Sequence, residues 1–574
     1  MKKYSLRDPI PEHIDKQFEV YSPLVRSLLY GRGIESLEEA EKFLNPSYDY
    51  HVHDPFLLSD MDRVVDRILS AVENKEKVAI FSDYDADGIP GAVVLHDFFK
   101  KIGYDNFINY IPLRNEEGFG LNHEAIDNLA SQNVHVIITI DCGITDIEQV
   151  ETANKHGMEV IITDHHLPGE KLPNAFATIN PKKAGDEYPE KMLCGSGVIF
   201  KVVQALIIKG KERRLFEIKD GHEKWFLDMV GLATLSDMVP LLGENRVFSH
   251  FGIKVLQKSP RAGLQKLLSL LNINQNTLTE DDVGFMITPR INAASRMGIP
   301  LDAFKLLSTS DEVEAGILAR HLDEKNNERK GLVASMVKEV KKKIERREES
   351  LRDVLVFGNP DWKPSLLGLV ANSFSDEHER PVFFWGRNGE SNGLIKGSCR
   401  AGGDTNIVHL MEKVKDIFVD YGGHKGAGGF SLQQENIHTL EDRLNEAYKE
   451  LLKEGTLESF ETVDKKISID DVNWDLYRQI EKFAPFGLDN PKPLFLLENA
   501  VVSTVKQFGK EKNHMELRFK KRDGKEIPAI AFFCTPEKYG VPVKEGGYIN
   551  LVATLEKSVF RNFPELRLRI VDIF

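Results

Sequence analysis

Three apolar runs that each end in polar residues decide the fold: KVAIFSDYD at residues 77–85, VHVIITIDCG at 134–143 and MEVIITDHH at 158–166. Such continuous apolar runs are typical of strands buried on both faces of a parallel sheet. The segments between them, GAVVLHDFFKKIG, EAIDNLASQN and DIEQVETANKHG, have helical spacing. The order strand, helix, strand predicts a doubly wound α/β sheet.

Polar side chains gather where these three runs end, and ligands of doubly wound sheets bind at the carboxyl ends of the strands. The residues at these ends are Asp83, Asp85, Asp87, Asp141, Asp164, His165 and His166. Alternating carboxylates beside Gly88 can turn toward one point, where a hard divalent cation would hold them. For the first motif alone, the alternative is an acidic turn solvated at the end of a strand.

Agreement among three neighbouring strand ends favours a metal site over isolated structural residues. Mixed Asp and His ligation suits Mn²⁺, with Mg²⁺ as the harder alternative. Two close divalent cations can activate a water and hold the phosphoryl oxygens of an in-line displacement. The pattern therefore predicts a metal-dependent phosphoryl-group hydrolase.

The rest of the chain predicts three further parts. Apolar residues at helical spacing indicate a connecting helix over 323–352, namely Val333, Val337, Val340, Ile344 and Leu351. A second, smaller α/β domain is expected over 353–455. Alternation in MELRFK at 515–520 and ELRLRI at 565–570 predicts a small antiparallel barrel over 456–574. The N-terminal segment and the first domain are expected to occupy residues 1–322.

Composition limits the class of protein. The chain has 574 residues, 41% hydrophobic and 29% charged, which is typical of a soluble protein with several cores. Its four cysteines form no CxxC pair, so neither a disulfide framework nor a zinc site is expected. The chain shows neither the apolar core of a signal peptide nor a run of about 18 to 20 apolar residues, so we expect a cytoplasmic protein.

The net charge of −14 and the pI of about 5.7 argue against binding to nucleic acid, because phosphate contacts need Lys and Arg. Nucleic-acid binding is compatible with this charge only if basic groups are concentrated in a groove while acidic groups gather at metals and on solvated faces.

Four ordered motifs resemble those of the DHH phosphoesterases: DYDADG at 83–88, IDCG at 140–143, DHH at 164–166 and LSDMVPL at 235–241. The resemblance implies metal ligation by Asp85, Asp87, Asp141, His165 and Asp237. Asp83 and His166 occupy motif positions that are either ligands or their neighbours.

Further motifs resemble the long members of that family, which degrade single-stranded DNA from the 5′ end. They are GRGIESLEEAEKFLNP, IPLRNEEGFGLN, LCGSG, GENR, PRINAASRMG, GSCR, GGHKGAGG and FAPFGLDNPKPLF, the last leading into an OB-fold. The resemblance implies that Arg114, Ser398 and Arg400 hold the 5′-terminal phosphate and that Phe119 stacks on a base. It places Arg290, Arg296 and His424 near the reacting phosphate, and Arg296 in a catalytic set with Asp141, His165 and His166.

For each of these substrate-binding residues the alternative is a surface salt bridge or a turn. One departure concerns Lys363, which follows Trp362 where the family commonly has His.

The function implied by the resemblance is metal-dependent hydrolysis of single-stranded DNA from the 5′ end to 5′-mononucleotides, in DNA recombination and repair. It implies two divalent cations, Mn²⁺ before Mg²⁺, a monomer, and a helicase and a single-strand-binding protein as partners. Two alternatives stay open. The first is a family oligoribonuclease or small-nucleotide phosphodiesterase, and the second is a catalytically silent DNA-binding scaffold.

Overall fold

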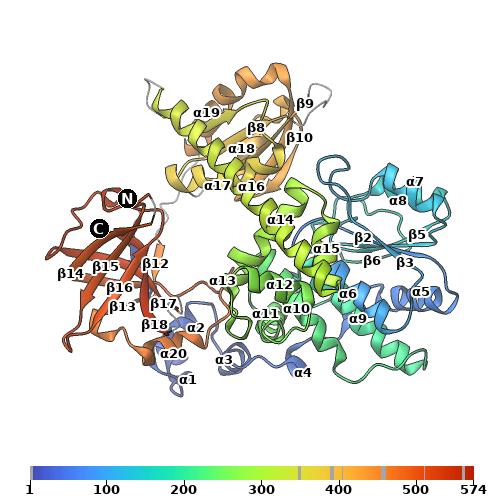
Figure 1. The fold of residues 1–574 in the computed structure, drawn as a ribbon, viewed down its shortest axis with the longest axis horizontal. Helices are drawn as coiled ribbons and strands as arrows, with labels where there is room; N and C mark the ends of the chain where they lie inside the picture. Colours follow the sequence, from blue (N-terminus) through green and yellow to red (C-terminus); the bar gives the residue numbers. More distant parts are fainter. Residues whose placement is uncertain are drawn as a thin grey trace.

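The computed structural model describes residues 4–346, 351–387, 394–403, 405–453, 461–509, 511–558 and 563–574. It contains a core α/β domain, a second α/β domain and a C-terminal barrel, and helix α16 leads from the first to the second (Figure 1). The predicted fold class is confirmed. The predicted boundary at 455 and 456 lies outside the described residues, as do residues 347–350 of the predicted connecting helix.

The core domain is built on a five-stranded parallel sheet. Its strands, in spatial order, are β3 (Phe107–Tyr110), β2 (Val78–Ser82), β4 (Val136–Ile140), β5 (Glu159–Thr163) and β6 (Ala177–Ile179). The three predicted strands are β2, β4 and β5, all rich in β-branched residues and buried. The two outer strands were not predicted, since each has only three or four residues.

Helices cover both faces of this sheet. Ile80 and Ile138 point to the face covered by three helices, whereas Phe81 and Ile137 point to the opposite face. The first face packs against α5 (Met61–Glu73), α6 (Gly88–Lys101) and α9 (Gly195–Glu212). The opposite face packs against α7 (His123–Ser131) and α8 (Ile147–Lys155). The sheet is therefore buried on both sides, as its apolar runs predict.

A helical layer completes the core domain next to α6 and α9 (Figure 1). It contains α10 (Leu227–Ser236), α11 (Gly243–Leu256), α12 (Ala262–Leu270), α14 (Thr288–Met297), α15 (Leu301–Ser308) and the start of α16 (Glu312–Glu345). α10 and α11 cross at two glycines: a Cβ added to Gly231 would lie 2.5 Å from the Cα of Gly252. Helix α16 begins eleven residues before the predicted start at 323, because Asp311 caps it by accepting from the N–H groups of Val313 and Glu314.

The second domain has a five-stranded mixed sheet in which β7 and β8 are parallel and the other neighbours are antiparallel. Its strands, in spatial order, are β10 (Phe418–His424), β11 (Ala427–Gln433), β9 (Leu394–Arg400), β8 (Val382–Gly386) and β7 (Leu355–Gly358). The helices are α17 (Pro364–His378), α18 (Ile407–Lys413) and α19 (Ile437–Lys453). Met336 and Val340 of α16 are buried with α17, so the connecting helix also belongs to this core.

The C-terminal barrel has five strands that close on one another. They are β14 (Phe495–Phe508), β15 (His514–Lys520), β16 (Glu526–Ala531), β18 (Glu565–Ile573) and β17 (Tyr548–Ser558), which returns to β14. The expectation of a wholly antiparallel barrel was wrong for one pair, because β16 and β18 run parallel. This strand order is that of the five-stranded OB-fold.

The N-terminal segment packs with the barrel, although residues 1–322 were expected to form one part. Its helices α1 (Glu12–Gln17), α2 (Pro23–Tyr30) and α3 (Leu37–Leu44) share one hydrophobic cluster with the barrel strands. Strand β1 (Tyr4–Leu6) also pairs in parallel with β12 (Glu461–Val463). Contacts between segments this far apart leave no local pattern in the sequence. Sequence order was therefore a poor guide to which domain the N-terminal segment packs against.

Arg246 of α11 joins three regions of the chain. Its guanidinium is fully buried and donates to the carbonyl of Phe43 in the N-terminal segment and to that of Phe483 at 3.0 Å. It also lies 3.7 Å from the centre of the Phe43 ring. A buried guanidinium can stay charged when carbonyl oxygens surround it. Arg246 therefore joins the core domain to the N-terminal segment and to the segment that precedes the barrel.

We expect Arg246→Met to lower the free energy of unfolding by about 2 to 4 kcal/mol, because it removes the guanidinium that donates to the Phe43 carbonyl and leaves the Phe483 carbonyl with Asn490 Nδ2 as its remaining donor. Urea unfolding followed by circular dichroism measures this. Arg478→Met is the matched control, since Arg478 is exposed and should change stability by less than about 0.5 kcal/mol. Equal effects of the two substitutions would contradict the role of Arg246.

Candidate metal centre

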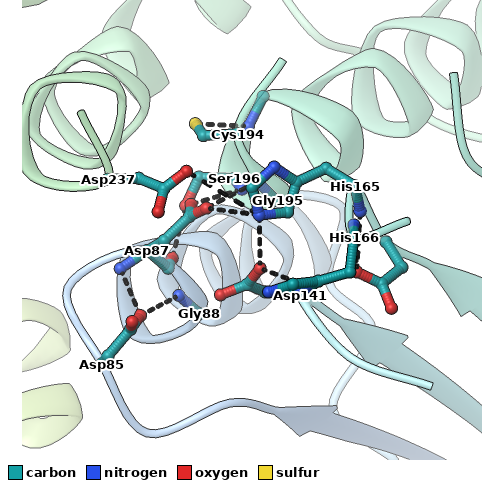
Figure 2. A network of polar contacts seen from close by, with 12 residues as sticks. Asp85, Asp87, Gly88, Asp141, His165, His166, Cys194, Gly195, Ser196 and Asp237 are labelled. Atoms are coloured by element: carbon teal, nitrogen blue, oxygen red, sulfur yellow. Dashed lines mark hydrogen bonds and ion pairs between the residues drawn. The ribbon is translucent and has the colours of Figure 1, made fainter. Parts of the chain in front are cut away.

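The acidic and histidine side chains lie at the carboxyl ends of the central strands of the core sheet (Figure 2). Asp85 and Asp87 follow β2, Asp141 follows β4 and His165 follows β5. β4 pairs with both β2 and β5, so Asp141 lies between the other two strand ends. Asp237, at the C-terminal end of α10, approaches the same point.

The imidazole of His165 is at the centre of the cluster. Its Nε2 lies 3.2 Å from Asp141 Oδ1, 3.7 Å from Asp237 Oδ2 and 3.9 Å from Asp87 Oδ2. Ligand atoms within 4.8 Å of one another form three overlapping sets. These are Asp87 with His165 and Asp237, Asp83 with Asp85 and Asp141, and Asp141 with His165 and His166. Asp141 therefore belongs to sets on both sides of the crevice.

Backbone N–H groups hold Asp87 in place. The first turn of α9 donates from Gly195 N and Ser196 N to the Asp87 carboxylate, at 2.6 and 2.7 Å. The Ser196 hydroxyl donates to the Asp87 carbonyl at 2.6 Å (Figure 2). A helix N-terminus favours negative charge, so α9 stabilises this carboxylate without neutralising the rest of the cluster.

Asp141 has an unusual backbone conformation for a non-glycine residue. Its φ of 62° lies in the left-handed region, which costs L-residues about 1 to 2 kcal/mol but is tolerated best by Asp and Asn. Gly195 lies directly against it: an added Cβ would be 2.5 Å from the Asp141 Cβ. Strain of this kind is typical of functional sites.

Asp164 orients the DHH turn and has no direct part in the sets of ligand atoms. Its carboxylate accepts from the N–H groups of Ile144, His165 and His166. It also contacts His166 Nδ1 at 2.8 Å. Burial raises the pKa of Asp164, but these hydrogen bonds lower it more, so the group is held as a carboxylate. His166 Nε2 is thereby directed away from Asp164, on a half-exposed ring.

Without a cation, the cluster of buried carboxylates would be electrostatically unfavourable. Burial, followed by repulsion from Asp85, raises the pKa of Asp87 to about 6. Burial and then repulsion from Asp87 and Asp85 raise the pKa of Asp237 to about 9, and burial raises that of Asp141 as well. Burial also lowers the pKa of His165 to about 3, so this ring is a neutral ligand. A cation would remove this repulsion.

Unused lone pairs also fit a metal ion. Within the described ranges, the buried Oδ1 atoms of Asp83 and Asp141 accept no hydrogen bond. Buried polar atoms are rarely left without a partner. A set of carboxylate oxygens and neutral imidazole nitrogen suits a divalent cation such as Mn²⁺ or Mg²⁺. The residues present therefore fit divalent metal binding.

Comparisons with known proteins agree with this geometry. Three family models match: the N-terminal domain of the DHH family over residues 77–234, the DHHA1 domain over 351–453 and the RecJ OB domain over 463–572. The single-stranded-DNA-specific exonuclease RecJ of Bacillus subtilis is 33% identical over 96% of this chain and 68% of its own length. That of Salmonella typhimurium is 30% identical over 96% of both chains. The chain belongs to the RecJ family.

The fold also matches that of a RecJ crystal structure. RecJ from Thermus thermophilus, in complex with Mn²⁺, superposes with a TM-score of 0.80 at 23% identity, covering 100% of this chain and 79% of that one. In the described part of the present chain, no helix is both long and apolar enough to span a bilayer.

In this RecJ-family chain, Ser398 and Arg400 lie together on β9. Arg400 Nη1 is 3.1 Å from Ser398 Oγ, and its Nε donates to Asn372 of α17 at 2.5 Å. A Cβ added to Gly368 would lie 2.9 Å from Arg400 Nη2 and 3.1 Å from Ser398 Oγ, so this glycine leaves room beside both groups. The two predicted phosphate partners are therefore neighbours.

Arg114 and Phe119 both contact the metal-binding motifs. The Arg114 guanidinium lies 4.9 Å from the centre of the Tyr84 ring, within DYDADG. The Phe119 ring is 48% exposed and packs edge-on against His166, with ring centres 5.5 Å apart. The structure thus brings a cation and an accessible aromatic ring next to the predicted metal ligands.

The remaining three predicted residues differ in their surroundings. Arg296 Nη1 donates to the carbonyl of Ser365 in α17, joining the two α/β domains. His424 is exposed and shares a row with Ala427 and Arg400 across β10, β11 and β9. Arg290 is not brought to the metal ligands by any such contact. Its guanidinium pairs with Asp323 of α16 at 2.8 Å and donates to the Met286 carbonyl.

Cations gather between the two α/β domains despite the net charge of −14. Burial and then the charges of Arg114 and Arg329 lower the pKa of Arg296 to about 9. Burial and then Arg290 lower the pKa of Arg329 on α16, and the same charges act on Lys330. Mutual repulsion of this kind requires that the guanidinium groups lie close together. An acidic protein can therefore gather several cations in one region.

Sequence reasoning missed Lys182, which lies on the turn after β6. Its ammonium is half-buried and interacts electrostatically with Asp237, Asp164 and Asp141. Asn180 holds this turn by accepting from Lys182 N and donating to the His166 carbonyl. Sequence reasoning also missed the roles of Ser196 and Asp164. No sequence motif distinguishes Lys182 from a surface lysine, whereas Ser196 lies within the LCGSG stretch.

We expect Asp141→Asn to reduce hydrolysis to a few per cent of the wild-type rate or less, because it removes a charge from the carboxylate common to two ligand sets. Asn tolerates the left-handed backbone, so the fold should survive. Calorimetric Mn²⁺ titration should show weaker binding. Asp127→Asn, an exposed substitution, is the control. Wild-type metal affinity and turnover in Asp141→Asn would contradict this site.

The raised carboxylate pKa values predict how stability depends on pH. In the unfolded chain these groups ionise near pH 4, whereas Asp237 retains its proton in the folded protein up to about pH 9. The folded state therefore binds more protons, and this stability is lost as pH rises over that interval. In EDTA, Tm should fall from pH 5.5 to 8.5 more steeply for wild type than for Asp237→Asn. Added Mn²⁺ should raise the wild-type Tm most at the higher pH. Parallel curves for the two proteins would refute this account.

Proposed function

We propose that this protein hydrolyses single-stranded DNA from its 5′ end, releasing 5′-mononucleotides in DNA recombination and repair. The observation that carries the proposal is that Arg296 of the core domain and Arg400 of the second domain lie against the same helix, α17. Arg296 of the core domain contacts Ser365 of α17, and Gly368, one turn further along, lies against Arg400 of the second domain. The RecJ relatives are named as exonucleases specific for single-stranded DNA.

The metal cofactor is proposed to be a pair of divalent cations, with Mn²⁺ preferred. The two ligand sets on either side of Asp141 support two positions: Asp83 and Asp85 on one side, Asp87, His165 and Asp237 on the other. The imidazole ligand favours Mn²⁺ over the harder Mg²⁺. The T. thermophilus relative has been crystallised with each of these metals.

Several side chains of the protein would each have a separate role in phosphodiester hydrolysis. Bound divalent cations would supply an activated water and neutralise charge on the phosphoryl oxygens. Asp141 and His165 hold the ligand positions, and Arg296 offers a guanidinium to the non-bridging oxygens. Asp164 fixes His166 Nδ1, so His166 Nε2 can donate a proton or a hydrogen bond to the phosphate or to the leaving oxygen.

Recognition of the 5′ end is assigned to Arg114, Ser398 and Arg400. Guanidinium groups form charge-assisted, often bidentate hydrogen bonds to phosphate, and a hydroxyl adds a further donor. Phe119 can stack on the terminal base, because its exposed ring lies beside His166. Binding the terminal phosphate would define which phosphodiester bond lies over the metal ligands.

The barrel is proposed to guide the rest of the strand. A surface cavity of about 270 Å³ on it is lined by the basic side chains of Lys506, Arg518 and Arg567, by aromatic rings that include Phe508 and Phe532, and by the acidic side chains of Glu516 and Glu565. OB-folds bind single strands by combining such cations with stacking platforms. Truncation near residue 455 would not test this cleanly, because the barrel also covers the apolar face of the N-terminal segment.

An enzyme confined to single strands needs an activity that separates duplex DNA, so a helicase and a single-strand-binding protein are the proposed partners. We propose a cytoplasmic monomer. Light scattering tests the oligomeric state. Faster degradation of a nicked duplex on addition of a helicase would support that partnership.

We expect Arg400→Ala and Arg114→Ala each to weaken the preference for 5′-phosphorylated over 5′-hydroxyl ends. Each loses a charge-assisted contact worth about 1.5 to 3 kcal/mol, or roughly 10- to 150-fold in kcat/KM. Cleavage should persist at reduced efficiency. The measurement compares kcat/KM for the two ends on single strands, with Arg443→Ala, an exposed arginine of α19, as control.

If both variants distinguish the two ends as well as wild type does, the phosphate pocket is wrongly assigned. A wild-type protein that hydrolyses dinucleotides faster than long 5′-phosphorylated strands would instead favour a small-nucleotide phosphodiesterase. A protein that binds DNA with Mn²⁺ present but never cleaves it would be a scaffold.

A further inference from the structure

A cavity of about 640 Å³ lies in the core domain, outside the metal centre. Its wall combines cationic, aromatic and hydroxyl side chains, namely Lys100, Lys101, His222, Trp225, Arg261 and Ser308. They come from the end of α6, the short helix η2 (His222–Phe226), the start of α12 and the end of α15. Its volume is within the usual range for small-molecule sites.

This cavity is at the opposite end of two helices from the metal ligands. Helix α6 begins directly after Asp87 and ends at Lys101, so its 14 residues span about 20 Å. Helix α10 begins beside Asp228, which lines the cavity, and ends at Asp237. A ligand in the cavity would therefore contact none of the metal ligands, and its binding can be measured separately.

The negative charges of the cavity are already paired. Arg261 donates to Asp228 and to Asp97, each at 2.7 Å, and to the Leu307 carbonyl at 3.1 Å. Burial would lower the pKa of Arg261, but the two carboxylates raise it more, so it stays protonated. The carboxylates of Asp97 and Asp228 are thus paired with Arg261 in the cavity wall, and its charge partly neutralises them.

Free donors remain at the mouth of the cavity. In the described part of the chain, neither the Lys101 ammonium nor the Ser308 hydroxyl has a hydrogen-bond or ion-pair partner. Lys100 is partly engaged by Asp105. Lys101 and His222 both line the cavity, and burial, followed by the charge of Lys101, lowers the pKa of His222. An ammonium and a hydroxyl with no partner are suited to a phosphate group.

Trp225 provides an aromatic wall beside these donors. Its side chain is 49% exposed, although large aromatic residues are usually buried, whereas the next residue, Phe226, is buried and packs edge-on against His222. An accessible indole is a stacking surface for a planar ring. The cavity therefore offers a surface for a base beside donors for a phosphate.

We propose that this cavity is a second ligand site, which binds a free nucleotide with its base against Trp225 and its phosphate at Lys101 and Ser308. A free nucleotide fits better than a DNA strand, because tracking several phosphates requires a row of cations. Here two lysines line an open surface cavity.

The test is calorimetric titration of the full-length protein with AMP in EDTA, where no divalent cation is available at the metal centre. AMP should bind with a Kd below about 1 mM, and adenosine or inorganic phosphate alone should bind at least about tenfold more weakly. Lys101→Ala and Trp225→Ala should each weaken AMP binding about tenfold or more. Trp225→Phe, which keeps an aromatic face, should bind AMP nearly as well as wild type.

The controls match the substitutions in kind. Lys155→Ala removes an exposed lysine from the end of α8, and Trp474→Ala removes a partly exposed tryptophan from α20 (Trp474–Glu481). Both should leave AMP binding unchanged. The proposal is overturned if AMP does not bind, if Lys101→Ala and Trp225→Ala bind it like wild type, or if only a single strand of several nucleotides competes for the site. Circular dichroism of each variant, with Trp225→Phe as the mild substitution, separates loss of binding from loss of fold.

Discussion

Repulsion among the buried carboxylates at the ends of β2 and β4 is the interaction on which the rest of the core domain depends. Asp83, Asp87 and Asp141 are nearly inaccessible to water, and the charges of Asp87 and Asp83 both act on Asp141. Such a group is stable only if the backbone supplies donors and a cation supplies charge. The N-terminus of α9 provides the donors for Asp87.

The same constraint explains several features that would otherwise be unrelated. The left-handed backbone of Asp141 turns its carboxylate into the crevice, and Gly195 has no side chain because that turn occupies the space. Asp164 orients the DHH turn through its hydrogen bonds, while burial lowers the pKa of His165 and keeps this central ring neutral. Each feature limits the freedom of a ligand before any ion arrives, which is how rigid metal sites achieve selectivity.

Much of this arrangement could be predicted from sequence because it follows from local patterns. Continuous apolar runs identify β2, β4 and β5, and a parallel sheet brings their ends together. The contributions of Ser196 and Lys182 could not be predicted this way. Ser196 contacts Asp87 across 109 positions, and Lys182 acts through a turn held by Asn180. The strands β3 and β6 were missed because segments of three or four residues carry too little periodicity.

The pairing of β1 with β12 has a consequence for how the chain folds as it is made. Tyr4 pairs with Glu461, and the helices that follow β1 bury Phe18 and Leu28 against barrel strands that end near residue 573. At about 5 to 20 residues per second, a ribosome would need roughly half a minute or longer to produce that partner. Meanwhile the core and second domains, whose hydrophobic clusters are contained within residues 48–453, can form first. During that interval the opening helices expose an apolar face, so the nascent chain has a period in which chaperones or misassembly can act on its first forty residues.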